Sequence, residues 1–267
     1  MKKVIQILAL IVVISSISVS KANSAMIIPS GIAQEISIAG YQPSEQGFFK
    51  AALDGNVATL GLFMEANAFV NIKNETGKTP VYLASSKGKV KAVKFLLLYG
   101  ADINARDEHL KSPLMAAIEA KSLETCQLLI TSGASVKTID ENGYTPLHYA
   151  ILNNQIEIAT IIANQFCDID ATDNEGNTPL FYTVGKEFSD KFIQMLIHSG
   201  ADINCINIGG KTVLHQAVIL NDNKAVKCLI ENGANVNMKD EQENTPVFYA
   251  KKDSPIYIML IESGAKI

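Results

Sequence analysis

Residues able to carry covalent or metal chemistry are few in this chain, whose 267 residues include four cysteines and four histidines. The cysteines are separated by 41, 38 and 23 residues, so no pair has the C-x-x-C spacing of a redox or zinc motif. No two histidines have the H-x-x-x-H spacing that places two zinc ligands on one helix face. The sequence therefore predicts no metal site, no cofactor and no enzyme.

Phosphate recognition has equally little support in the sequence. Residues 209–212, Gly-Gly-Lys-Thr, lack the upstream glycine of a phosphate-binding loop. The net charge is −4, and Arg106 is the only arginine. Because proteins that bind nucleic acids neutralise phosphates with a basic surface, we expect no nucleic-acid partner.

The N-terminus has the pattern of a secretory leader. A positively charged start is followed by apolar residues at positions 4–14, except for Gln6, and then by small residues. We predict a signal peptide over residues 1–22, with cleavage after Ala22 or, as the second choice, after Ala25. Its apolar run is shorter than the roughly 20 residues of a membrane-spanning helix. We expect an exported protein, periplasmic or secreted and from a bacterium, with no membrane span after cleavage.

Two motifs recur in one register along the rest of the chain. The first opens a unit, at spacings of 33, 33, 33, 34 and 33 residues: Thr79-Pro80, Ser112-Pro113, Thr145-Pro146, Thr178-Pro179, Thr212-Val213 and Thr245-Pro246. The second closes a unit: Gly100-Ala101, Gly133-Ala134, Gly200-Ala201, Gly233-Ala234 and Gly264-Ala265. Such periodicity is the signature of a repeat protein.

Each unit predicts two helices and a loop. Thr145 is suited to cap a helix, with Pro146 at its first position. In a second helix, apolar residues such as Val93 and Leu96 recur at helical spacing, and Gly100 ends it. Polar turn residues follow and favour an extended hairpin. Neither helix buries its apolar face alone, so the units must stack side by side.

These motifs resemble the ankyrin repeat family, whose unit of about 33 residues opens T-P-L-H-x-A and closes G-A-D-x-N. Residues 145–148 and 200–204 match those patterns closely. The resemblance implies an all-α solenoid of about seven stacked helix-turn-helix units with β-hairpin loops over residues 46–267. It also implies a structural role for His148 and His215, which occupy the histidine position of the motif. We place the units at 46–78, 79–111, 112–144, 145–177, 178–211, 212–244 and 245–267.

Several units depart from the pattern. The first lacks the opening Thr-Pro and the last holds Ser254-Pro255 between its helices, so we interpret both as caps. The fifth has one extra residue near Gly185, which predicts a longer turn. The fourth has Phe166-Cys167 in place of Gly-Ala, and a left-handed phenylalanine there would cost about 1 kcal/mol. Residues 23–45 have no repeat frame and form either a linker or an N-terminal cap.

The repeat frame also assigns the cysteines and the acidic residues. Cys126 and Cys228 fall at core positions of second helices, and Cys167 and Cys205 are the only pair in neighbouring units to check for a disulfide. Units stack about 10 Å apart, beyond the roughly 7 Å between disulfide Cα atoms, so we favour four reduced, packed thiols. Pairs such as Asp140-Glu141 recur with the hairpins, and we interpret them as a solvated acidic row.

We predict a non-catalytic module that binds a protein partner through its concave face and hairpin tips, and we expect a monomer. In the family, variable positions before Thr-Pro and at the ends of first helices carry partner contacts. The candidate residues at such positions are Tyr144, Leu152, Asn153, Asn177, Ile208, Lys211, Ile219 and Leu220. Two alternatives stay open: the apolar candidates pack internally, or the protein is an exported redox-protective or enzymatic protein that uses its cysteines or histidines.

Overall fold

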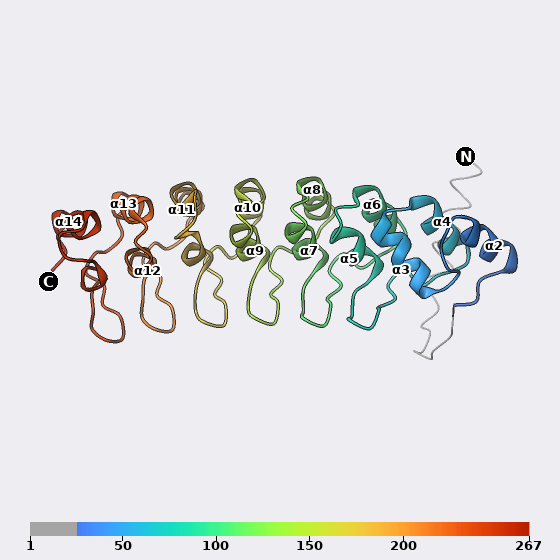
Figure 1. Ribbon diagram of the computed structural model, residues 1–267, viewed down its shortest axis with the longest axis horizontal. Coiled ribbons are helices and arrows are strands. Elements are labelled where there is room, and N and C mark those ends of the chain that lie inside the picture. The colour runs from blue at the N-terminus through green and yellow to red at the C-terminus, as the bar shows by residue number, and fades with distance from the viewer. Residues whose placement is uncertain (1–25, 267) are drawn as a thin grey trace.

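The computed structural model describes residues 26–266, which form an elongated stack of helix pairs with α2 at one end and α14 at the other (Figure 1). The predicted signal peptide, with both predicted cleavage positions, lies outside the described residues. The helices before the regular repeats are α2 (Ser30–Ile38), α3 (Glu45–Asp54) and α4 (Val57–Glu65). No helix within residues 26–266 is long and apolar enough to cross a membrane.

The helices of the following repeats form two rows. The first helices are α5 (Pro80–Ser85), α7 (Pro113–Glu119), α9 (Pro146–Leu152), η1 (Pro179–Thr183), α12 (Val213–Ile219) and η2 (Pro246–Tyr249). The second helices are α6 (Val90–Leu98), α8 (Leu123–Thr131), α10 (Ile156–Ala163), α11 (Ser189–His198), α13 (Asn223–Glu231) and α14 (Pro255–Glu262). The loops between repeats all project on the side of the first helices (Figure 1).

First helices begin as the capping residues predict. The hydroxyl of Thr145 accepts the N–H of His148, three residues on, at 3.4 Å, with Pro146 at the first helical position. Ser112 caps α7 in the same way, at 3.3 Å. Thr178 and Thr245 make no such side-chain bond, and the short helices that follow them, η1 and η2, are 3₁₀ helices.

The core is one thin, continuous layer along the stack. Leu96 of α6, Leu129 of α8 and Leu196 of α11 are fully buried and occupy equivalent positions in their repeats. Each first helix packs against the first helix of the next repeat, as α5 does on α7 and α7 on α9. No unit has a separate core, so stability is shared between neighbouring units.

The loops are hairpins in shape but have little β-structure. Within residues 26–266 the only β-bridge joins Ile206 and Thr212. Side chains instead link successive loops: the amide of Asn71 donates to the Gly100 carbonyl at 3.2 Å and accepts the Asp102 N–H at 2.7 Å. At the tip of one hairpin Gly143 is left-handed (φ 83°), and a Cβ there would lie 2.8 Å from the Cα of Asp173 in the next hairpin; Leu110 and Glu243 take the same left-handed conformation at the equivalent position of their hairpins.

Both ends of the stack are irregular. Residues 30–38, in the segment for which a linker and a cap stayed open, form α2, which packs on α4 and fully buries Ile36. In the first unit Asn67 takes the left-handed conformation (φ 58°) where every other unit except the fourth has glycine. At the other end, the Ser254 hydroxyl caps α14 by accepting the N–H of Tyr257 at 3.2 Å, with Pro255 at its first position.

Two expectations for the fourth unit need correction. Helix α10 ends at Ala163, and Phe166 does not adopt a left-handed backbone, so the strain expected there is absent. The chain leaves the helix early, and the Phe166 side chain is 97% exposed. Cys167 is only half-buried, although its position suggested that it would replace the buried alanine of the motif.

Candidate partner-binding surface

The acidic residues of the hairpins divide into buried aspartates and exposed glutamates. Asp140 is 3% exposed, and its Oδ1 accepts the N–H groups of Asn142 and Tyr144 at 2.9 and 2.8 Å. Asp107, Asp173 and Asp240 hold their hairpins with the same two bonds. The expected solvated acidic row is therefore wrong for the aspartates, which are structural, and holds for neighbours such as Glu141.

Hairpin tips are tied into a row by one backbone bond per step. The N–H of Glu141 donates to the His109 carbonyl of the preceding hairpin at 3.1 Å, and the Ile208 N–H donates to the Glu175 carbonyl at 3.1 Å. Glu108 and Glu241 make the equivalent bond. The residues at this position are thus the exposed Glu108, Glu141, Asn174 and Glu241, with Ile208, which is 68% exposed, as the apolar one among them.

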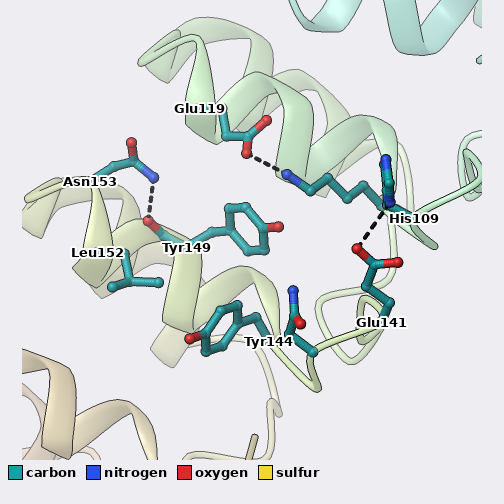
Figure 2. A pocket seen from close by; sticks show the side chains of 9 residues that line it. His109, Glu119, Glu141, Tyr144, Tyr149, Leu152 and Asn153 are labelled. Carbon is teal, nitrogen blue, oxygen red and sulfur yellow. Dashed lines mark hydrogen bonds and ion pairs between the residues drawn. The ribbon is translucent and has the colours of Figure 1, made fainter. Parts of the chain in front are cut away.

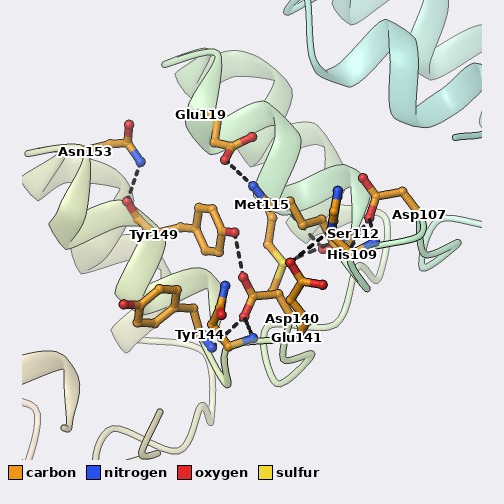
Figure 3. A network of polar contacts seen from close by, with 12 residues as sticks. Asp107, His109, Ser112, Met115, Glu119, Asp140, Glu141, Tyr144, Tyr149 and Asn153 are labelled. Carbon is orange, nitrogen blue, oxygen red and sulfur yellow. Dashed lines mark hydrogen bonds and ion pairs between the residues drawn. The ribbon is translucent and has the colours of Figure 1, made fainter. Parts of the chain in front are cut away.

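Tyrosines of three first helices reach down to the buried aspartates. The Tyr149 hydroxyl donates to Asp140 Oδ2 at 2.8 Å (Figure 3), and Tyr182 and Tyr249 donate to Asp173 and Asp240. Burial and the neighbouring carboxylate raise the pKa of Tyr149 and Tyr182. Although burial alone would raise the pKa of Asp240, the bonds from Tyr249 and two N–H groups lower it. The phenols therefore stay protonated donors, and they line the inner side of the hairpins.

The two motif histidines tie the start of a unit to the hairpin that closes it. In His148, Nδ1 accepts the Thr145 N–H at 3.1 Å, and Nε2 lies 3.3 Å from the carbonyl of Asn177, the last residue of the same unit. His215 has the same contacts with Thr212 and Asn244. Burial lowers the pKa of both imidazoles. Both rings are therefore engaged in the structural role that the family resemblance implied.

All four cysteines are free thiols, and none is joined to another. Cys126 and Cys228 are buried in second helices as expected, while Cys167 and Cys205 are half-buried. Burial raises the pKa of Cys126 to about 12 and that of Cys205 to about 11, and it also raises the pKa of Cys167 and Cys228. Among residues 26–266 no group of three or more His, Cys, Asp or Glu side chains is placed to hold a metal ion.

Candidate residues at the ends of first helices form a partly exposed helix-end row, which we define as Leu152, Asn153, Ile219 and Leu220. The side chains of Leu152, Ile219 and Leu220 are 38%, 41% and 48% exposed, so each is partly packed and partly accessible to solvent. The turn between η1 and α11 joins them, because Lys186 donates to the Leu152 carbonyl at 3.4 Å and Gly185 lies against the Leu220 side chain. The structure thus places candidates from two separate repeats on one strip.

The candidate residues of the hairpins differ in their contacts and in their exposure. The Tyr144 hydroxyl lies 3.2 Å from that of Tyr182, with the two rings edge to face. Lys211 places its Nζ 5.2 Å from the ring centroid of Tyr249. Asn177 is a correction: its side chain is 8% exposed and bonds to Asn207, so it supports the hairpins and offers little surface to a partner.

A pocket of about 450 Å³ opens between the hairpins and the helix-end row at the third and fourth repeats (Figure 2). Its polar wall has two ion pairs, Lys111 Nζ to Glu119 at 2.8 Å and His109 Nδ1 to Glu141 at 2.9 Å. The bond to Glu141 raises the pKa of His109. Tyr149 lies between the two pairs, and Leu152 forms an apolar edge.

Sequence reasoning did not select Tyr149 as a site residue. The signal was present, because tyrosine follows the hairpin aspartate by nine residues in three repeats, and each such pair is hydrogen-bonded. Phe248 was also missed. It occupies the motif's histidine position in η2, where His148 and His215 contact the hairpin that closes their own unit, and it is 67% exposed.

Comparison with known proteins identifies the family. The family described as "Ankyrin repeats (3 copies)" matches residues 30–107, 48–140, 114–207 and 180–267. The chain belongs to the ankyrin repeat family. Ankyrin repeats form protein–protein interaction modules and bind protein partners, and the all-helical solenoid described above agrees with that membership.

Segments of longer proteins are similar to parts of this chain. Human "Neurogenic locus notch homolog protein 1" is 41% identical over 58 residues, which cover 22% of this chain and 2% of that protein. A "Putative ankyrin repeat protein" of Borreliella burgdorferi is 41% identical over 70 residues, which cover 26% of this chain and 17% of that protein. The chain therefore spans only a small part of these relatives.

Two solved ankyrin repeat domains match this chain over nearly their whole length. The ankyrin repeat domain of Bcl-3 is 26% identical, with a TM-score of 0.72, and covers 80% of this chain and 97% of that domain. The human ASB11 ankyrin repeat domain is 22% identical, with a TM-score of 0.70, and covers 82% of this chain and 98% of that domain. The ASB11 likeness supports the ankyrin fold alone.

Proposed function

We propose that this ankyrin repeat protein is exported and acts as a non-catalytic binding module. It binds a protein partner between its hairpin tips and its helix-end row. The observation that carries the proposal is the strip formed by Leu152, Ile219 and Leu220, each 38–48% exposed at the ends of first helices. Exposed apolar residues that are grouped and bordered by polar ones are typical of interaction sites.

We propose that the strip forms one wall of a groove whose other wall is the row of hairpins. Ile208 and Lys211 lie on the hairpin between the fifth and sixth repeats, and Tyr144 lies on the hairpin before the fourth. The tyrosines between the two walls are fixed by hydrogen bonds to buried aspartates. A rigid groove loses little entropy when it binds, which favours recognition of an extended segment of a partner.

The charge pattern supports a protein partner rather than a nucleic acid. The chain has a net charge of −4, and its hairpin tips carry exposed glutamates. Such a surface repels phosphate backbones and attracts basic groups. Export is proposed from the leader pattern at residues 1–22 alone, and N-terminal sequencing of the mature protein tests cleavage after Ala22 or Ala25.

The alternative function, redox protection or catalysis by cysteine or histidine, draws no support from the site. A reactive cysteine needs a lowered pKa, and the pKa of every thiol here is raised. The two buried histidines are engaged with capping residues and backbone carbonyls. The hydroxyls beside the two rings, those of Thr145 and Thr212, are buried and serve as helix caps, accepting the N–H groups of His148 and His215.

Affinity capture with surface variants tests the proposed function. Leu152→Asp and Leu220→Asp should abolish capture of the partner and leave the unfolding temperature nearly unchanged, because both side chains are already partly exposed. Leu98→Asp is the matched control, since Leu98 is 77% exposed at the end of second helix α6. Unchanged capture by Leu220→Asp together with lowered thermal stability would show that the strip is a packing feature instead.

A further inference from the structure

The ammonium group of Lys111 lies in the pocket between the third and fourth repeats. Lys111 Nζ lies 2.8 Å from a carboxylate oxygen of Glu119 and 5.2 Å from the ring centroid of Tyr149. A carboxylate and the face of an electron-rich ring are the two groups that attract organic cations. The side chain of Lys111 therefore shows which chemistry this pocket accepts.

The surroundings of the pocket carry more negative than positive charge. The carboxylates are Glu119, Glu108 and Glu141 near its rim and Asp107 and Asp140 beneath it. Against these five stand three groups: Lys111, Lys186, whose Nζ donates to the Leu152 carbonyl at 3.4 Å, and His109, which pairs with Glu141 at 2.9 Å and Glu108 at 3.7 Å. The excess of negative charge is present whether or not His109 is protonated, and it attracts cations.

A second site in the same chain provides an internal comparison. Exactly corresponding positions lie 100 residues further on, where Lys211 is stacked over Tyr249 at 5.2 Å and Tyr249 is bonded to Asp240. There Ile219 stands in place of Glu119, and no ion pair to Lys211 is present among the described residues. The stacked lysine is thus common to both sites, and the added carboxylate is specific to the pocket.

We propose that this pocket binds an arginine side chain of the partner, and that Lys111 is a resident competitor which moves aside. A planar guanidinium stacks on a ring and pairs with a carboxylate through two parallel bonds, whereas an ammonium makes a point contact. Tyr149, fixed by Asp140, and Glu119 supply those two contacts, with Leu152 against the aliphatic stem. The inference deepens the proposed function by naming the chemistry of the partner.

The position of the pocket also sets the form of the partner segment. The pocket and the Ile219–Leu220 end of the helix-end row lie two to three repeats apart, which at about 10 Å per repeat is about 20–30 Å. An extended chain covers about 3.3 Å per residue. The partner segment should therefore carry an apolar residue about six to nine positions from its arginine.

A small probe tests the pocket without knowledge of the partner. N-acetyl-arginine N-methylamide should bind and shift the NMR signals of the Asn153 side-chain amide and the Leu152 methyl groups. The citrulline analogue, which has the same shape and no charge, should bind at least tenfold more weakly. Glu119→Gln should weaken the arginine probe at least fivefold, and Lys111→Ala should tighten it about threefold, because the competitor is gone.

Ile219→Glu is the matched gain-of-function variant, which should create a second arginine site beside Tyr249 and keeps the test valid if Glu119→Gln fails to fold. Equal shifts with the arginine and citrulline probes would overturn the inference, as would an arginine affinity that Glu119→Gln and Lys111→Ala leave unchanged. Leu220→Asp should not affect the probe. If the probe fails to bind while Leu220→Asp still abolishes partner capture, the pocket inference falls and the proposed function stands.

Discussion

Asp140→Ala should destabilise the protein far more than its position in a surface loop suggests. The carboxylate of Asp140 accepts the N–H groups of Asn142 and Tyr144 and the hydroxyl of Tyr149, and it is 3% exposed. Each buried donor left without a partner costs about 1–3 kcal/mol, and some of the three will find water. We therefore expect a loss of about 3 kcal/mol in the free energy of unfolding.

The chain itself supplies the comparison for this prediction. Asn207 occupies the equivalent position in another hairpin and accepts the N–H groups of Gly209 and Lys211 at 3.1 Å, so Asp140→Asn should cost only about 1 kcal/mol. Glu141→Ala, next to Asp140 but exposed, should cost less than about 0.5 kcal/mol. Urea unfolding followed by circular dichroism measures all three. A cost for Asp140→Ala that equals that of Glu141→Ala would refute the argument.

Two further predictions concern the buried titratable groups. Burial lowers the pKa of His148 and His215 in the folded state. The free energy of unfolding is therefore unaffected by these histidines above their unfolded pKa, near 6.5, and decreases as the pH falls below it. The urea midpoint should therefore decrease from pH 7.5 to pH 5.5, and less so when both are changed to Gln; an equal decrease in that variant would contradict the linkage. Cys126, with its raised pKa and buried side chain, should react with a thiol reagent only in denaturant, and rapid labelling of the native protein at Cys126 would contradict this.

Much of the fold was predictable because the residues of the repeat motif determine where each first helix begins. Ser112 and Thr145 cap first helices with Pro at the next position, as the sequence indicates. The end of α10 was not predictable in the same way. Without glycine at position 166 the chain can either adopt a strained left-handed residue there or end the helix earlier, and the sequence alone does not distinguish these; the structure has the earlier end, at Ala163.

The site was predictable in position but less so in chemistry. The ends of first helices and the hairpins can be located from the motif, which places Leu152 and Leu220 on the surface. Burial of Asp140 and Asn177 was not evident, because polar residues in a loop are usually exposed. Contacts with the following repeat, from Tyr149 to Asp140 and from Asn207 to Asn177, bury these two side chains. The pairing of Lys111 with Glu119 likewise depends on side-chain geometry that spacing alone does not fix.

Site-specific photo-crosslinking tests most directly whether a partner occupies the groove. A benzophenone amino acid introduced in place of Leu152 or Leu220 would lie on the helix-end row, and the same residue in place of Leu98 would lie on the row of second helices. On irradiation in the cells that produce the protein, we expect one discrete product of higher mass from the first two positions and none from the third. A product from position 98 alone would contradict binding in the groove.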